Sequence, residues 1–201
     1  MRKSLWVIPI ALLFATIIGA PASHAGSITY KISDTASGRI GGTSFTDALV
    51  TIAFMGNTSN VHVSGGAGNF LNVLGTATVT ISGIGTFSFT DPVGVDAFQG
   101  GNGVPPVAEM VDFSDATVIF GTANSAFAAY GLTTAIGPLT GNAFTDFDMY
   151  RTTDGLLIFS GAIGGDSTFT ATTATTEPSS LLLFGTSLFG LVPFRRKLFG
   201  R

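Results

Sequence analysis

Apolar and polar residues alternate with a two-residue period along most of this chain. In residues 76–82, Ala77, Val79 and Ile81 alternate with Thr or Ser at every other position. A two-residue period places successive side chains on opposite faces of a β-strand, and a run rich in Thr, Val and Ile favours a half-buried strand. Similar alternation recurs in residues 28–33, 47–54 and 168–172. The pattern predicts an all-β fold.

Turn-forming residues interrupt the alternating runs, as short turns between antiparallel strands require. Examples are Gly41-Gly42, Gly56-Asn57, Gly65-Gly66, Asp91-Pro92, Gly137-Pro138 and Asp154-Gly155. Residues 99–106 are the most linker-like stretch and the candidate division between two sheets or two halves. The pattern predicts one antiparallel β-sandwich or jelly-roll-like domain over residues 26–171.

The first 25 residues have the organisation of a secretory signal peptide. Arg2 and Lys3 precede an almost unbroken apolar run at residues 5–20, and small residues lie at positions −3 and −1 of a cut after Ala25. This order predicts that signal peptidase removes residues 1–25 during export. The alternative is a membrane anchor that is not cleaved.

The predicted mature segment is strongly acidic. Residues 26–176 contain three basic residues and eleven Asp or Glu, so their net charge is 3 − 11 = −8. No basic stripe is present to neutralise phosphates, which argues against nucleic-acid binding. The chain contains no cysteine, so disulfides, thiol catalysis and an N-terminal lipid anchor on Cys are excluded.

A second apolar segment lies near the C-terminus. Residues 180–194 contain no charged side chain, and Arg195, Arg196 and Lys197 follow directly. A basic cluster after an apolar run favours a cytoplasmic position for that cluster. We therefore predict a transmembrane helix at about residues 180–194, with the acidic domain outside. The alternative is a buried C-terminal helix of the globular domain.

Residues 177–201 resemble a PEP-CTERM sorting signal. The motif Glu177-Pro178-Ser179-Ser180, the glycines at positions 185 and 190, and the closing basic triplet carry this resemblance. The family's motif begins with proline, where this chain has Thr176. The resemblance implies recognition by an exosortase-like membrane protease in a Gram-negative bacterium that makes extracellular polysaccharide. It also implies transient anchoring in the inner membrane, followed by delivery to the cell surface or matrix, with residues 172–176 as a Thr-rich spacer.

Residues suited to metal binding are sparse in the predicted domain. His62 is its one histidine, and alternation places it on the polar face of a strand. One His without Cys does not supply the usual four-ligand zinc site. Asp112 and Asp115 form a close pair in turn-like sequence, and loop carboxylates suit calcium. They are the weak calcium candidates, and no other cofactor is expected.

A candidate binding edge contains Asp146, Asp148, Tyr150 and Arg151, where an aromatic residue stands among charged residues. A tyrosine offers an apolar face and a polar tip to a ligand such as a polysaccharide. The alternative is an ordinary loop.

These patterns together predict an exported, non-enzymatic protein of the cell surface or extracellular matrix, with a structural or adhesive role. The chain contains no G-x-S-x-G nucleophile motif. Two other functions stay open. One is a module that binds exopolysaccharide or calcium. The other is a matrix polysaccharide hydrolase, which would use two carboxylates.

Overall fold

The computed structural model describes residues 26–160 and 165–174. Within these ranges the chain forms thirteen β-strands and two short 3-10 helices, with no α-helix. The strand pairs are antiparallel, so the prediction of an all-β antiparallel fold is confirmed. The predicted signal peptide and the sorting tail with its helix at residues 180–194 lie outside the described ranges. Inside those ranges, no helix has the length and apolar character needed to cross a membrane.

The strands in chain order are β1 (Ser27–Ile40), β2 (Thr43–Asn57), β3 (His62–Val63), β4 (Asn69–Asn72), β5 (Gly75–Ile81), β6 (Gly85–Ser88), β7 (Val93–Phe98), β8 (Val107–Asp112), β9 (Thr117–Ala123), β10 (Ile136–Phe144), β11 (Met149–Thr152), β12 (Gly155–Phe159) and β13 (Asp166–Thr173). The 3-10 helices are η1 (Thr58–Asn60) and η2 (Ser125–Ala129).

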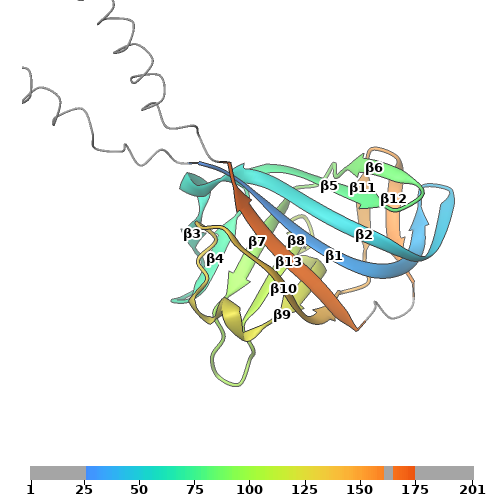
Figure 1. Cartoon of the computed structure of the whole chain (residues 1–201). Helices are drawn as coiled ribbons and strands as arrows, with labels where there is room; N and C mark the ends of the chain where they lie inside the picture. Colours follow the sequence, from blue (N-terminus) through green and yellow to red (C-terminus); the bar gives the residue numbers. More distant parts are fainter. Residues whose placement is uncertain (1–25, 161–164, 175–201) are drawn as a thin grey trace, which may run out of the picture.

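The strands form one continuous curled sheet. Its order is β3-β4-β7-β8-β9-β10-β13-β1-β2-β5-β6, and β12 pairs with both β1 and β11. The sheet curls so that β2 and β5 contact β7 across the interior (Figure 1). The layer formed by β13, β1, β2 and β5 therefore faces the layer formed by β7, β8 and β9, with the core between them.

Strand β1 connects the parts of this sheet. It pairs with β2 along one edge, from Ser27 to Ile40. On its other edge it pairs first with β13, over residues 28–33, and then with β12, over residues 38–40. Ile28, Tyr30 and Ile32 are fully buried, whereas the residues between them face outward, as the two-residue period predicts.

The sheet closes on itself at the far end of β1. The end of β6 meets β11 through a bridge between Phe89 and Thr152. The Thr90 backbone N–H donates to the Arg151 carbonyl at 3.0 Å, and the Thr153 N–H donates to the Ser88 carbonyl at 2.9 Å. Strands β1, β2, β5, β6, β11 and β12 therefore form a closed ring, which leaves little unpaired edge at this end.

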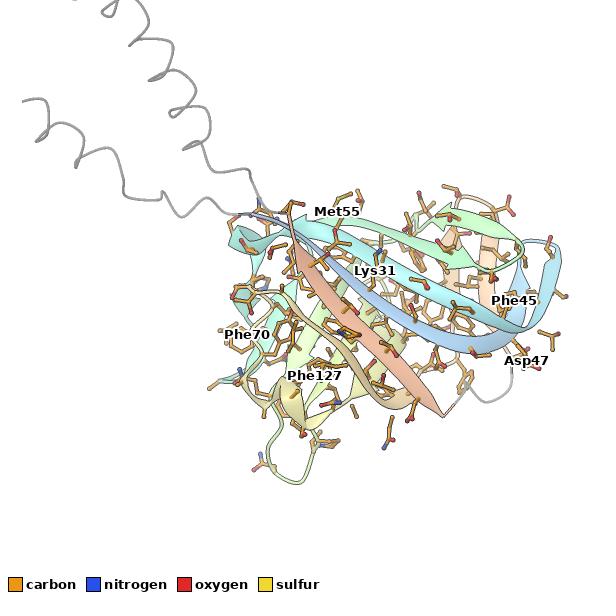
Figure 2. The ribbon with its side chains drawn as sticks, viewed as in Figure 1. Lys31, Phe45, Asp47, Met55, Phe70 and Phe127 are labelled. Carbon is orange, nitrogen blue, oxygen red and sulfur yellow. The ribbon has the colours of Figure 1, made fainter. Side chains whose placement is uncertain are left out.

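Aromatic rings fill the space between the two layers. Phe127 from η2 meets Phe169 of β13 edge to face at 5.3 Å between centroids. Phe120 of β9 stacks on Phe159 of β12 at 4.8 Å. Phe127, labelled in Figure 2, is fully buried, and its helix η2 contacts β7 and β8. These contacts join distant parts of the chain. Aromatic pairs of this kind stabilise a fold beyond the effect of burying their apolar surface.

Two sequence-based boundaries differ from the structure. Residues 99–106 do not divide two sheets, because Phe98 pairs directly with Val107 and the segment is the loop of the β7–β8 hairpin. Strand β13 also continues into the predicted spacer, since Thr172 and Thr173 pair with Thr29 and Ile28. Their β-branched side chains suit a strand as well as a spacer.

We expect Tyr30→Phe to lower the free energy of unfolding by about 1–3 kcal/mol, because it leaves buried polar groups without a partner. The Tyr30 hydroxyl donates to the Leu132 carbonyl and accepts from Asn72 Nδ2 at 3.2 Å. Tyr130→Phe is the matched control, since the Tyr130 hydroxyl makes one longer bond, to the Thr134 carbonyl at 3.3 Å. Urea unfolding of both variants measures the difference. An equal or smaller loss in Tyr30→Phe would contradict this assignment.

Candidate functional site

The predicted binding edge lies on β11, beside the junction that closes the ring of strands. Tyr150 is fully buried, and its hydroxyl donates to the Val118 carbonyl at 2.9 Å. Burial raises the pKa of this hydroxyl above its ordinary value. The expectation of an accessible Tyr150 is therefore wrong. Alternation along β11 turns Tyr150 into the core and leaves Met149 and Arg151 outside.

The charged residues of the predicted edge stabilise its backbone. Asp146 Oδ2 accepts from the Val118 N–H at 2.6 Å, and Asp148 Oδ1 accepts from the Met149 N–H at 2.7 Å. Arg151 Nε lies 3.6 Å from Asp91 Oδ2, so this ion pair spans the junction between β11 and the segment after β6. The structure brings these residues together at one end, but they chiefly hold the turn and the junction.

Exposed apolar side chains, which the sequence prediction did not include, lie at the same end. Phe147 is 48% exposed, Met149 is 56% exposed and Leu156 is 40% exposed. Leu156 lies opposite Arg151 in the register of β11 and β12. We call Phe147, Met149 and Leu156 the distal patch. Met149 and Arg151 alternate outward along β11, whereas Phe147 lies before that strand, so the strand period does not indicate its exposure.

The backbone at Phe147 is unusual for an aromatic residue. Its φ of 54° lies in the left-handed region, which is sterically costly for a bulky side chain. The Phe147 N–H donates to Thr145 Oγ1 at 3.4 Å, and Asp146 and Asp148 hold the residues on either side. Unfavourable conformations of this kind are often found at functional sites. Here the conformation accompanies an exposed aromatic ring.

Asp112 and Asp115, the weak calcium candidates, differ in their surroundings. Asp112 is 2% exposed, and its Oδ1 accepts from the Ser114 N–H at 2.8 Å. Asp115 lies exposed in the turn after β8. Across residues 26–160 and 165–174, no three or more His, Asp or Glu side chains are grouped so that they could hold a metal ion. His62 is exposed on β3, but its neighbour Val63 is exposed as well, so this strand does not show the expected alternation.

Strands β7 and β8 carry a pair of acidic residues that the sequence pattern does not indicate. Asp96 and Glu109 lie directly opposite each other in the register. Their neighbours Val95 and Ala97 are fully buried, so alternation directs Asp96 to the outer face. Glu109 is also opposite Gly121 of β9, and the Phe144 ring occupies the space that a side chain at Gly121 would fill. The carboxylate pair therefore lies in a partly apolar setting.

These surroundings make both carboxyl groups weak acids. Burial raises the pKa of Glu109 to about 7, and the negative charges of Asp96 and Asp146 add to the effect. Burial raises the pKa of Asp96 to about 6, although a hydrogen bond from Asn69 opposes the shift. Asp96 Oδ1 is buried without a hydrogen-bond partner. The pair can hold a proton near neutral pH, which is a requirement for general acid–base chemistry.

Asp34 is a third carboxyl group with a raised pKa. It follows Ile32 on the inner face of β1 and is 4% exposed. Burial raises its pKa to about 6, against a hydrogen bond that its Oδ1 accepts from the Thr35 N–H at 2.6 Å. The other oxygen, Oδ2, has no hydrogen-bond partner.

No protein-family model matches this chain, and the searches of curated proteins and of solved structures found no match either.

We expect the domain to lose stability as the pH rises from about 4.5 towards 7. In that window unfolded Glu109 has its ordinary pKa of 4.5 and releases its proton, whereas folded Glu109, with a pKa of about 7, keeps it. The folded state then binds more protons than the unfolded state, so stability falls with increasing pH. Asp96 and Asp34, with folded pKa values of about 6, act in the same direction.

Thermal unfolding between about pH 4.5 and pH 7.5 measures this effect. Glu109→Gln should make the decline in melting temperature shallower, because Gln cannot ionise. Asp115→Asn, at an exposed turn position, is the control that should keep the slope of the unmodified protein. The same slope in Glu109→Gln would exclude Glu109 as a source of the pH dependence.

Proposed function

We propose that this chain is an exported, non-enzymatic protein with a structural or adhesive role at the cell surface or in an extracellular polysaccharide matrix. Its described part would be the displayed unit, a β-sandwich or jelly-roll-like domain. Signal peptidase would remove residues 1–25 after Ala25. The tail would then hold the protein in the inner membrane until an exosortase-like protease acts near Glu177 and Pro178. Arg195, Arg196 and Lys197 would stay on the cytoplasmic side.

The main support for this proposal is that the first strand of the domain begins where the last one ends. The Ala174 N–H donates to the Ser27 carbonyl at 2.9 Å, so the first and last described residues lie side by side. Figure 1 places both ends at one end of the domain, and β11 and β12 at the other. The thirteen steps from Ser27 to Ile40 along β1 correspond to roughly 40 Å at the rise of a strand. A tether at residue 175 would direct the distal patch away from the membrane.

The distal patch supports the adhesive part of the role. Met149 and Leu156 lie diagonally across the β11–β12 pair, where long side chains can meet, and contiguous exposed apolar side chains are typical of interaction sites. Phe147, Met149 and Leu156 lie at the end that would face outward, and Arg151 is at their border. An aromatic ring, a thioether and an aliphatic side chain suit contact with an apolar surface of another molecule.

Mass spectrometry of the protein recovered from the cell surface tests this proposal. We expect an N-terminus at Gly26 and a C-terminus near residues 177–180. Glu177→Ala combined with Pro178→Ala should leave the tail in place and keep the protein in the membrane fraction. Thr175→Ala is a control outside the motif and should be processed normally. An intact Arg201 on surface-located protein would contradict the sorting proposal.

One observation favours a second function, a hydrolase that acts on a matrix polysaccharide. Directly opposite residues of antiparallel strands have Cβ atoms about 4.5–5.5 Å apart, so two acidic residues in such positions are near neighbours, and glycoside hydrolysis uses a pair of carboxyl groups. Asp96 and Glu109 are such a pair. With a pKa of about 7, Glu109 would be a proton donor at neutral pH and Asp96 the partner carboxylate.

Release of reducing sugar from matrix polysaccharide tests this second function. Glu109→Gln should lower the rate by about 100-fold or more, the usual contribution of a general acid. Asp115→Asn should have no effect. The hydrolase function would be excluded if the unmodified protein releases no sugar, or if Glu109→Gln is as active as the unmodified protein.

A further inference from the structure

Hydroxyl-bearing side chains form a continuous row across six neighbouring strands. Each member lies opposite the next in the strand register. In order from β10 through β13, β1, β2 and β5 to β6, the row consists of Thr140, Thr168, Ser33, Thr51, Thr80 and Thr86. We call these six residues the hydroxyl row.

Hydrogen bonds within the row hold its side chains in pairs. The hydroxyl oxygens are 3.1 Å apart in Thr140 and Thr168, 2.9 Å apart in Ser33 and Thr51, and 2.8 Å apart in Thr80 and Thr86. A hydroxyl group has one donor and two acceptor positions, so a single shared bond leaves further capacity on each residue. The row therefore offers fixed hydroxyl groups with unused hydrogen-bonding positions to the outside.

Two further rows extend this surface towards the chain ends. One row contains Thr170, Lys31, Ala53, Thr78 and Ser88, and the next contains Thr172, Thr29, Met55 and Thr76. Figure 2 shows Lys31 and Met55 on this side of the molecule. Neighbouring strands are about 4.8 Å apart, and outward residues of one strand are about 6.7 Å apart. The three rows together form what we call the hydroxyl face.

The charge of this face differs from that of the rest of the domain. Lys31 is its one charged residue, although residues 26–176 have a net charge of 3 − 11 = −8. Carboxylates appear on the same strands only beyond the hydroxyl row, as at Asp166, two residues before Thr168 on β13. The outer face of the opposite layer instead contains the Asp96–Glu109 pair. Strand propensity accounts for the many threonines, but it does not account for this separation of charge.

We propose that the hydroxyl face binds a neutral, extended polysaccharide. Sugar hydroxyls can exchange hydrogen bonds with the unused positions of the rows, and the threonine methyl groups can contact the apolar faces of sugar rings. The Lys31 ammonium group supplies three donors for sugar oxygens. Repeated rows match a polymer better than a single sugar. A neutral chain is favoured because the net charge of the domain repels a polyanion. This inference rests on the proposed location at the surface or in the matrix.

Co-sedimentation of the full chain, purified in mild detergent, tests the inference. The neutral probes are microcrystalline cellulose and cross-linked dextran, and an alginate gel is the polyanionic probe. Thr51→Val with Thr80→Val removes two hydroxyls from the middle of the row and keeps β-branched side chains. We expect the half-saturating concentration for a neutral probe to rise about fivefold or more, as the loss of two hydrogen bonds implies.

Matched variants separate this face from general changes of the surface. Thr43→Val with Thr46→Val alters two exposed positions of the same strand, β2, outside the face, and should leave binding unchanged. Lys31→Gln should weaken binding, whereas Arg39→Gln, at another exposed position of β1, should not. Circular dichroism verifies the fold of each variant. If the double Thr variant does not fold, the comparison of Lys31→Gln with Arg39→Gln tests the inference instead.

Three outcomes overturn the inference: no binding to either neutral probe, unchanged binding when the face is altered, or tighter binding to alginate than to the neutral probes. Failure of the proposed function gives a different result. A protein with an unprocessed tail that still binds a neutral probe through Thr51 and Thr80 would refute the sorting proposal and leave this site in place. A correctly processed surface protein that binds no probe would refute only the site.

Discussion

The paired edges of β1 are the constraint on which the rest of the structure depends. One edge is hydrogen-bonded to β2, and the other is shared between β13 and β12. This division places the last strand of the domain beside the first and joins the closed ring to the open part of the sheet. The buried row Ile28, Tyr30 and Ile32 keeps that arrangement in register, because a slip of one residue would turn it to the solvent.

The same constraint separates the surfaces of the domain by position. The chain ends meet at one end of β1, and the ring that carries the distal patch closes at the other. The outer face around β1 presents hydroxyl groups and Lys31, whereas the outer face of β7 and β8 presents a half-buried carboxylate pair. One curled sheet therefore gives the domain an end for attachment, an end with exposed apolar side chains, and two sides of different chemistry.

The alternation of apolar and polar residues predicts the strands well, but it does not locate the candidate sites. Alternation correctly assigned the buried residues of residues 28–33, 76–82 and 168–172, because the side-chain period of a strand is local. Within the predicted binding edge, Tyr150 faces the core, whereas Phe147, which the prediction does not include, is exposed. The sequence pattern does not indicate the Asp96–Glu109 pair, because the two residues are joined only by the register of β7 and β8, which spans the loop at residues 99–106.

By itself, the sequence determined the all-β character of the domain, the strand faces, the acidic charge and the absence of cysteine. These properties depend on composition or on residues a few positions apart. Only the tertiary structure decided which strands are neighbours. That choice joined hydroxyls from six strands, raised the pKa values of Asp96 and Glu109, and brought Ser27 next to Ala174. Such features depend on the pairing of distant segments, which forms when the sheet curls around a shared core.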